Sequence, residues 1–374
     1  MTDEPDVPAA DGRPDESIST RTGGSGDGEA SAGADTPLAA VVAKSRADAA
    51  IESLRAEAVH DDGRHIREAG AECVAVPVTD PPNETAVREV VVQRDPDYRN
   101  RGLPDLLRER GFSEAEVDRA PGSWAVVGDV VLVRFGDCQR REAVGEALLD
   151  LHGEADTVLA REGVAGQHRE PDVTVVAGSG DTETVHTEHG TDYALDLAEV
   201  MFSPGNEAER VRMGDAVAPG EQVLDMFAGI GYFTLPMARA GASVTAVERN
   251  PTAFRYLVEN AALNDVTDAV EAIRADCRDV VPDVVPPADR VVMGHFDATE
   301  RDYLDAAIGA AAPGGRLHVH AAVPEAEFPE RPADRFDAAA SAAGVAVADR
   351  SVRRIKSYSA GVVHGVLDAT LGDR

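Results

Sequence analysis

Lysine, cysteine and aromatic residues are all scarce in this sequence. Two of the 36 basic residues among 374 are lysines, Lys44 and Lys356, which leaves 34 arginines. Aromatic residues make up 4% of the chain. The three cysteines, Cys73, Cys138 and Cys277, lie far apart and form no CxxC pair. This spacing argues against a disulfide framework and a zinc site, so we expect no metal and a cytoplasmic location.

Long apolar segments are also missing. No apolar run approaches the roughly 18 residues of a membrane span, and the N-terminal residues contain no apolar signal core. We therefore expect neither a membrane anchor nor a secretory signal. Hydrophobic residues still make up 43% of the chain, which is enough for packed cores. The length suggests two or three domains, at ~100–200 residues each.

Basic residues are far fewer than acidic residues. The 36 basic and 68 acidic residues give a formal charge of −32 and a pI near 4.6. Such a balance argues at first against a nucleic-acid partner, because basic patches usually supply the affinity. An acidic, lysine-poor surface also suits molar salt, however, where the Debye length falls to ~3 Å and self-repulsion is screened. The composition therefore predicts a halophilic protein and leaves the partner open.

The N-terminal part of the chain divides by composition. Residues 1–36 contain almost no large apolar side chains, which predicts a disordered acidic tail. Residues 37–85 form a candidate α/β module, with strands expected at Ala40–Lys44 and Cys73–Val78 and a helix at Arg46–Ala58. Residues 86–200 form a candidate middle unit. Its expected helices are Leu103–Arg110 and Glu142–Leu151, and its expected strands are Trp124–Phe135, Val173–Ala177 and Tyr193–Leu197.

Residues 201–374 alternate between apolar strands and helices. The expected strands are Gln222–Phe227, Ser243–Glu248, Val270–Ala275, Arg290–Phe296 and Arg316–Val323, with helices such as Leu235–Ala240 and Pro251–Leu263 between them. Val345–Ile355 and Gly361–Leu371 predict a closing antiparallel pair, because no helix fits between them. The pattern predicts an α/β fold, with helices on both faces of a parallel sheet and a ligand at the carboxyl ends of its strands.

Carboxylates end three consecutive strands of this region. Asp225 precedes a loop with two closely spaced glycines, Gly229 and Gly231, which let a ligand approach the backbone. Glu248 ends the next strand, 23 residues after Asp225, where a carboxylate can accept hydrogen bonds from both ribose hydroxyls. Asp276 ends the third strand, where it can accept from an adenine amino group while the backbone amide of Cys277 also contacts the base.

Three ligands compete for this loop. A dinucleotide needs GxGxxG, but Phe233 and Thr234 follow the glycines, and a pyrophosphate would lie near Asp225. A P-loop needs a lysine that this region lacks. S-adenosylmethionine is a cation without phosphate, so a carboxylate-rich rim favours it. A purely structural turn is the remaining alternative, and it would leave the three strand-end carboxylates unexplained.

Several motifs resemble a known family, the archaeal tRNA wybutosine-synthesising transferases, which are grouped with the guanine-37 N1-methyltransferases of tRNA. The matching segments are Phe202–Asn206, Glu209–Met213, Asp225–Phe233, Asp289–Gly294 and Arg354–His364, with weaker similarity in Trp124–Val133 and His168–Ala177. Residues 38–80 resemble the small domain with which the methyltransferase branch engages the tRNA elbow. The resemblance implies a class I S-adenosylmethionine-binding domain over 201–374 and a tRNA-facing middle domain over 86–200.

The two branches of the family differ after the fourth strand. The methyltransferases carry Asn-Leu-Pro there, whereas this sequence has Met293-Gly294-His295-Phe296, as the wybutosine transferases do. The resemblance thus implies transfer of the 3-amino-3-carboxypropyl group to C7 of 4-demethylwyosine at position 37 of tRNA-Phe, with release of 5′-methylthioadenosine. The sulfonium carbon that lies in line with the nucleophile receives the attack, so turning the methionine arm changes the product.

The resemblance also implies roles for individual residues. Glu209 matches a proton acceptor, Arg210 is placed to pair with the methionine carboxylate, and His295 lies beside the expected reaction centre. The expected cofactor-binding residues are Ser203, Arg210, Asp225, Phe227, Gly229, Gly231, Glu248, Asp276 and Cys277. Lys356 is a candidate contact to tRNA phosphate.

The expected partner is the anticodon stem-loop of tRNA, bound by a monomer. Guanine-37 N1-methyltransferase remains an alternative, since the small N-terminal module is typical of that branch. A tRNA-binding protein that keeps the cofactor fold without catalysis is a third interpretation. For a tRNA enzyme this acidic, we expect positive potential confined to one groove.

Overall fold

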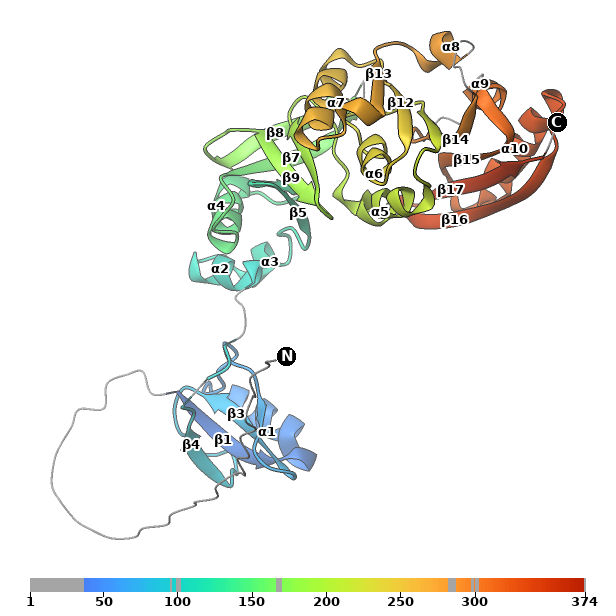
Figure 1. Ribbon diagram of the computed structural model, residues 1–374. Helices are drawn as coiled ribbons and strands as arrows, with labels where there is room; N and C mark the ends of the chain where they lie inside the picture. Colours follow the sequence, from blue (N-terminus) through green and yellow to red (C-terminus); the bar gives the residue numbers. More distant parts are fainter. Residues whose placement is uncertain are drawn as a thin grey trace, which may run out of the picture. The chain divides into compact units, whose positions relative to one another are not determined.

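The computed structural model describes residues 37–94, 96–98, 102–165, 170–281, 287–296, 299 and 303–372. They belong to two compact units, Met1–Asn100 and Arg101–Arg374 (Figure 1). The expected acidic tail, 1–36, lies outside the described residues. Among the described residues, no helix is long and apolar enough to cross a membrane.

The first unit is a four-stranded antiparallel sheet with one helix. The sheet has the order β2-β3-β1-β4 and is formed by β1 (Leu38–Ala43), β2 (Arg67–Glu68), β3 (Cys73–Val78) and β4 (Glu89–Val92), while α1 spans Ala47–Ala56. Leu54 of α1 packs with Val76 in the core. The expected domain boundary at 85/86 comes one strand too early, because β4 pairs with β1. The buried Arg64 reinforces this link by donating to Leu38 O and Gln93 Oε1, each at 2.9 Å.

The second unit begins with a smaller sheet of order β5-β6-β7-β8. Its strands are β5 (Trp124–Val127), β6 (Val130–Val133), β7 (Thr157–Ala165) and β8 (Glu170–Gly178), accompanied by α2 (Leu103–Glu109), α3 (Glu114–Val117) and α4 (Arg141–Leu151). The single strand expected over Trp124–Phe135 is wrong. The chain reverses at Gly128, whose φ of +57° suits a two-residue turn, so the apolar run forms a hairpin.

A hairpin leads from this sheet into the C-terminal region. It consists of β9 (Glu183–Glu188) and β10 (Thr191–Asp196), and it is followed by α5 (Glu207–Ala216). Asn260 and Asn264 of the helix α7 (Pro251–Leu263, with Asn264 as its C-cap) bond to the backbone of β10, for example from Asn260 Nδ2 to Ala194 O at 3.1 Å. The hairpin is therefore fixed against the larger sheet.

Seven strands form the larger sheet, in the order β13-β12-β11-β14-β15-β17-β16. They are β11 (Gln222–Asp225), β12 (Ser243–Val247), β13 (Val270–Ile273), β14 (Ala288–Met293), β15 (Ala311–Pro324), β16 (Val347–Ser359) and β17 (Val362–Leu371). The strands β11 to β15 pair in parallel, and β17 pairs antiparallel with both β15 and β16. The predicted α/β class and the predicted closing antiparallel pair are confirmed.

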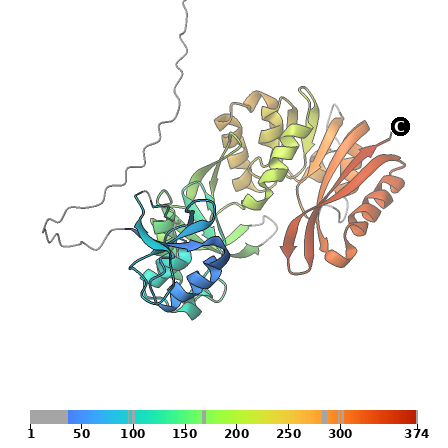
Figure 2. The same ribbon diagram turned by 90° about the horizontal axis from the view of Figure 1, so that it is seen from below.

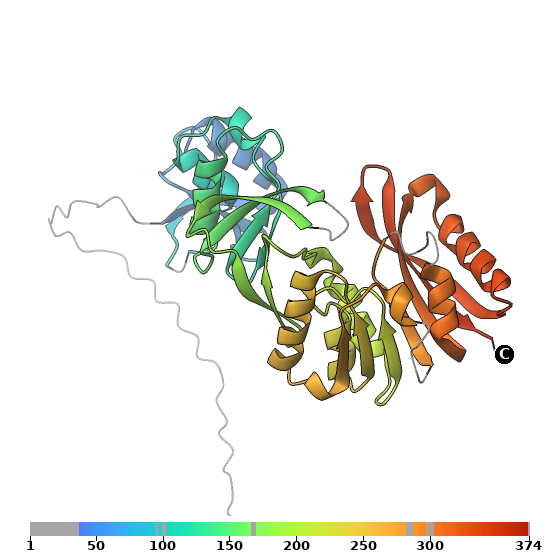
Figure 3. The same ribbon diagram turned by 90° about the horizontal axis from the view of Figure 1, so that it is seen from above.

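Helices cover both faces of this sheet. Val223 and Val292 face a core with α6 (Thr234–Arg239) and α7, whereas the next residue in β11, Leu224, faces α9 (Tyr303–Ala310) and α10 (Glu330–Ala342). This alternation is the period of two that a strand imposes. The long helix α10 runs beside the C-terminal strands in both further views (Figures 2 and 3). The strand order reverses next to β11, which is where a ligand crevice is expected.

Candidate functional site

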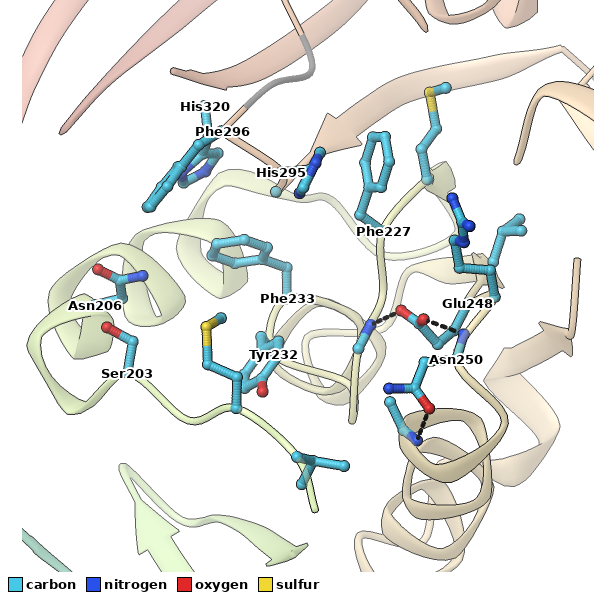
Figure 4. A pocket seen from close by; sticks show the side chains of 18 of the residues that line it. Ser203, Asn206, Phe227, Tyr232, Phe233, Glu248, Asn250, His295, Phe296 and His320 are labelled. Carbon is cyan, nitrogen blue, oxygen red and sulfur yellow. Dashed lines mark hydrogen bonds between the residues drawn. The ribbon is translucent and has the colours of Figure 1, made fainter. Parts of the chain in front are cut away.

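A cavity of about 440 Å³ opens at the carboxyl ends of β11, β12 and β14. Glu248 and Asn250 lie on one side of it, Ser203 and Asn206 lie on the opposite side, and Tyr232 and Phe233 lie between them (Figure 4). The volume is within the usual range for a small-molecule site, ~300–1,000 Å³. The cavity lies at the edge of the sheet where the order of strands and helices predicts a ligand.

The glycine loop shapes the floor of the cavity. Gly229 has a φ of +58°, and an added Cβ there would lie 2.4 Å from the Tyr232 ring. Its backbone N–H donates to Glu248 Oε2 at 2.8 Å, and Asn250 N–H donates to Glu248 Oε1 at 2.7 Å (Figure 4). A carboxylate has about four acceptor sites, so Glu248 keeps capacity to accept from a ligand hydroxyl. Burial raises the pKa of Glu248 above its ordinary value.

Asp276 and Cys277 both line the cavity, as predicted. Asp276 caps the short helix α8 (Cys277–Val280) and accepts from Arg278 N–H at 3.1 Å and from its guanidinium Nη2 at 2.8 Å. The hydrogen bond from Arg278 keeps the pKa of Asp276 below its ordinary value. Burial raises the pKa of the Cys277 thiol to about 12, so this side chain stays a neutral thiol and is no nucleophile.

Asp225 and Gly231 do not line the cavity. Asp225 is fully buried beneath the loop, where it accepts from Thr234 Oγ1 at 2.8 Å and from Phe227 N–H at 3.3 Å. Gly231 has a φ of +105°, and an added Cβ would lie 2.8 Å from Leu235. Both residues hold the shape of the loop, so their predicted role as direct cofactor contacts is corrected to a structural one.

Arg210 reaches the cavity wall, but a protein carboxylate occupies its guanidinium. Nε and Nη2 donate to the two oxygens of Glu188 on β9 at 2.6 and 2.7 Å, and Nη1 donates to Ser203 O at 3.1 Å. Both side chains of this ion pair are more than 90% buried. The expected pairing of Arg210 with the methionine carboxylate is therefore corrected, since the bidentate fork is already used within the protein.

Glu209 lies outside the cavity. Its side chain is 3% exposed and is paired with Arg212 at 2.6 Å and Arg353 at 3.1 Å. Arg353 also pairs with Asp368 of β17 at 2.9 Å, so the four side chains form one cluster under the sheet. A carboxylate held between two guanidinium groups away from the cavity cannot take a proton from a bound base. The predicted proton-acceptor role of Glu209 is corrected accordingly.

Lys356 of β16 is a cavity residue, not one of the outer surface. Its side chain is half-buried, and Nζ donates to Ser203 Oγ at 3.2 Å. Burial and the nearby Arg210 and Arg161 lower its pKa from the ordinary value. Among the residues that the structure describes, no carboxylate pairs with Lys356. The end of the cavity opposite Glu248 is therefore positively charged and suits an anion.

Aromatic rings form the remaining wall. His295, which the sequence placed here, lies 5.2 Å from the ring of Phe227, and Phe227 also contacts Tyr303 at 5.2 Å. Sequence reasoning missed the other cavity residues in this wall and beside it, which include Asn206, Tyr232, Phe233, Asn250, Phe296 and His320. Tyr232 and Phe233 directly follow the glycine loop, which was the available signal. The described part of the chain holds no cluster of three His, Cys, Asp or Glu side chains suited to a metal ion.

Comparison with known proteins gives consistent matches. A family model of the TRM5/TYW2 methyltransferase domain matches residues 184–348, and a model of the TYW2 N-terminal domain matches residues 103–182. The tRNA(Phe) (4-demethylwyosine(37)-C(7)) aminocarboxypropyltransferase of Pyrococcus horikoshii is 38% identical over 276 residues, which cover 72% of this chain and 98% of that protein.

Two solved structures show the same fold. The crystal structure of P. horikoshii TYW2 in complex with MeSAdo superimposes with a TM-score of 0.62 at 34% identity, and the match covers 73% of this chain and 100% of that one. The crystal structure of wild-type Trm5b from Pyrococcus abyssi has a TM-score of 0.67 at 28% identity. That match covers 90% of this chain and 99% of that one.

Proposed function

The chain belongs to the TRM5/TYW2 methyltransferase family, and on this premise we propose that it is a tRNA 3-amino-3-carboxypropyltransferase. It transfers this group from S-adenosylmethionine to C7 of 4-demethylwyosine at position 37 of tRNA-Phe and releases 5′-methylthioadenosine. The match to an aminocarboxypropyltransferase over 98% of that protein's length carries the proposal. The TYW2 N-terminal domain, matched over residues 103–182, supports it.

The cavity residues fit S-adenosylmethionine. Glu248 accepts from the ribose hydroxyls, Asp276 accepts from the adenine amino group, and the backbone of Cys277 lies beside the same ring. Phe227, two residues after the end of β11, packs against the adenosine. When bound, the cosubstrate supplies a sulfonium whose carbons are electrophilic. The protein's part is to decide which of those carbons faces the tRNA base.

Lys356 is the residue that we propose for the methionine carboxylate. The structure commits Arg210 to Glu188, whereas Lys356 lines the cavity beside Ser203. A bound anion would offset the burial and the nearby arginine charges that lower the pKa of Lys356. Asn206 supports this assignment, because its Oδ1 is buried without a partner among the described residues and suits the α-amino group. A charged ammonium and a carboxylate oxygen form a strong hydrogen bond.

Comparing two ligands tests this assignment. Lys356→Gln should weaken S-adenosylmethionine binding by about tenfold or more, because a charge-assisted hydrogen bond is lost. Binding of 5′-methylthioadenosine, which lacks the aminocarboxypropyl arm, should stay unchanged. Equal binding of S-adenosylmethionine by the variant and by the wild type, together with weaker tRNA binding, would assign Lys356 to a tRNA phosphate instead. Glu248→Ala, at the opposite end of the cavity, is the control. It should weaken the binding of S-adenosylmethionine and of 5′-methylthioadenosine to the same extent.

Guanine-37 N1-methyltransferase is the second candidate. The match to the Trm5b structure covers 90% of the chain, against 73% for TYW2, so it extends into the first unit. The end of β14 opposes this candidate, because Met293-Gly294-His295-Phe296 replaces the Asn-Leu-Pro motif of the methyltransferases. Gly294 also lets the edge of the Phe233 ring approach, since an added Cβ would lie 3.0 Å from Phe233 Cε2.

One experiment separates the candidates. The protein is incubated with S-adenosylmethionine in molar potassium chloride, with tRNA-Phe that carries either 4-demethylwyosine or unmodified guanosine at position 37, and the nucleosides are weighed by mass spectrometry. A gain of an aminocarboxypropyl group on demethylwyosine is expected. A gain of one methyl group on guanosine would favour the second candidate. Cofactor binding without any transfer would favour a non-catalytic tRNA-binding protein.

Further features belong to the same proposal. We propose that the enzyme acts as a cytoplasmic monomer in high salt, since its formal charge is −32. The first unit would contact the tRNA elbow, while Arg134 and Arg161 of the middle sheet, which line the cavity, would face the anticodon stem-loop. In brine the release of counterions contributes less to binding. Shape, stacking and these local arginine contacts then contribute relatively more.

A further inference from the structure

Two buried histidines lie side by side on neighbouring strands behind the cavity. His320 of β15 is 1% exposed and His364 of β17 is 0% exposed. Ala322 pairs with His364 in the antiparallel ladder, so His320 and His364 are diagonal neighbours on one face of the sheet. His320 Nδ1 lies 3.0 Å from His364 Nε2, which is a hydrogen-bond distance.

Both rings are neutral at physiological pH. Burial lowers the pKa of His364 to about 4 and the pKa of His320 well below its ordinary value. A neutral imidazole carries one N–H and one bare nitrogen. The hydrogen bond between the rings uses one donor and one acceptor. His320 Nε2 and His364 Nδ1 are left buried, without a partner among the described residues.

Only one of these two nitrogens can meet a ligand. His320 lines the cavity, whereas His364 does not. Because His320 Nδ1 bonds to His364, Nε2 is the nitrogen that this cavity-lining ring has left for a ligand. The ring of Phe233 flanks His320 at 5.1 Å, and the ring of Phe296 packs against His364 at 4.5 Å. The unpartnered nitrogen is thus set into an aromatic wall.

The position of the proton follows from the cost of an orphaned group. A buried N–H without a partner is rarer in proteins than a buried lone pair without one. His364 Nδ1 has no access to a ligand, so a proton there would remain unpaired in every state. The favoured arrangement has His364 Nε2–H donating to His320 Nδ1. His320 then carries its proton on Nε2, where a ligand can accept it.

We propose that His320 donates a hydrogen bond from Nε2 to a ring nitrogen or carbonyl oxygen of the tRNA base, and that His364 is a positioning residue which fixes the tautomer of His320. This inference rests on the proposed function and deepens it. A flat, tricyclic base suits the part of the cavity wall that contains Phe233 and Phe296, because unstacked RNA bases bind by stacking on aromatic rings. Stacking leaves the base free to rotate in its plane, and one directional donor removes that freedom.

Matched substitutions test the donor. His320→Phe keeps a flat ring but removes both nitrogens, and it should lower kcat/KM for tRNA bearing 4-demethylwyosine by about tenfold to one hundredfold. His320→Gln restores a donor near the position of Nε2 and should recover much of the loss. His364→Phe removes the group that fixes the tautomer of His320, and it should lower kcat/KM by a smaller factor than His320→Phe does. His189→Gln changes an exposed histidine outside the cavity and should leave the rate unchanged.

Two further readouts separate this role from a structural one. The affinity for S-adenosylmethionine and the unfolding midpoint should stay near the wild-type values in all four variants. His320→Phe that keeps the wild-type kcat/KM, or that loses S-adenosylmethionine binding in proportion, would overturn the inference. Equilibrium binding of tRNA with and without the modified base is measured in parallel. If the wild type binds but transfers nothing, the proposed function fails, and the loss or retention of base discrimination by His320→Phe still decides the role of His320.

Discussion

Replacing Asp225 by asparagine distinguishes a structural carboxylate from a ligand-binding one. Asp225 is fully buried and accepts hydrogen bonds from Thr234 Oγ1 and Phe227 N–H. Burial is the largest influence, and it raises the pKa of Asp225 from 3.8 to about 6, with a smaller contribution from the charge of Glu248. That difference corresponds to about 3 kcal/mol between the two protonation states.

Proton linkage gives the direction in which pH changes the free energy of unfolding. The folded protein holds this proton more tightly than the unfolded chain does, so the stabilising contribution is fully present below pH 3.8 and is lost as the pH rises through about 6. Asparagine cannot ionise, yet its amide oxygen can accept one hydrogen bond while the Thr234 hydroxyl turns to accept the other. At about pH 8, Asp225→Asn should raise the free energy of unfolding by up to about 3 kcal/mol.

Urea unfolding in molar potassium chloride, measured from about pH 4 to pH 8, gives the free energy of unfolding at each pH. The wild type should lose stability across this window relative to the variant. Asp289→Asn, at an exposed position in β14, is the matched control; its amide oxygen can still accept from Gln222 N–H, so its stability should follow the wild-type pH curve. S-adenosylmethionine affinity should change little in Asp225→Asn, since Asp225 does not line the cavity. A large loss of affinity would refute the structural role, and a variant less stable than the wild type at pH 8 would refute the linkage argument.

Two other predictions concern the cavity wall and the cluster beneath it. Gly294→Ala pushes on the Phe233 ring, so the transfer rate should fall by up to about tenfold, whereas Gly309→Ala, where an added Cβ meets nothing within 4 Å, should leave it unchanged. Rates from nucleoside mass spectrometry check this, and equal rates in both variants would contradict it. Glu209→Ala removes one of the two carboxylates, Glu209 and Asp368, that Arg212 and Arg353 share, so the free energy of unfolding should drop by about 2 kcal/mol. Unchanged S-adenosylmethionine affinity with reduced stability is expected, and the reverse result would return Glu209 to the site.

Local signals predicted much of the fold correctly. Strand and helix periods repeat every two and 3.6 residues, so short windows around Gln222–Phe227 or Pro251–Leu263 already carry the information. Where local windows failed, a turn or a distant strand decided the outcome. Gly128 divides an apolar run into a hairpin, and β4 joins the first unit because its partner β1 lies about fifty residues earlier in the chain.

Site residues divide in the same way. The sequence placed Glu248, Asp276 and the glycine loop at strand ends, and all of them meet at the cavity because parallel strands end at one edge of a sheet. It could not show that Arg210 of α5 forms an ion pair with Glu188, which lies 22 positions earlier in β9. Nor could it show that Asp225 and Glu209 face away from the cavity, since residue type and spacing do not reveal which side chain a fold buries.

The sequence by itself determined the alternating α/β order, the carboxylates at three strand ends and the motifs of a tRNA-modifying family. Only the tertiary structure decided which charged groups face the ligand, because that depends on contacts between distant segments. Lys356 meets Ser203 across 153 residues, and His320 meets His364 across 44. Burial then sets the charge of each group, since a low-dielectric interior favours neutral side chains unless an opposite charge lies beside them.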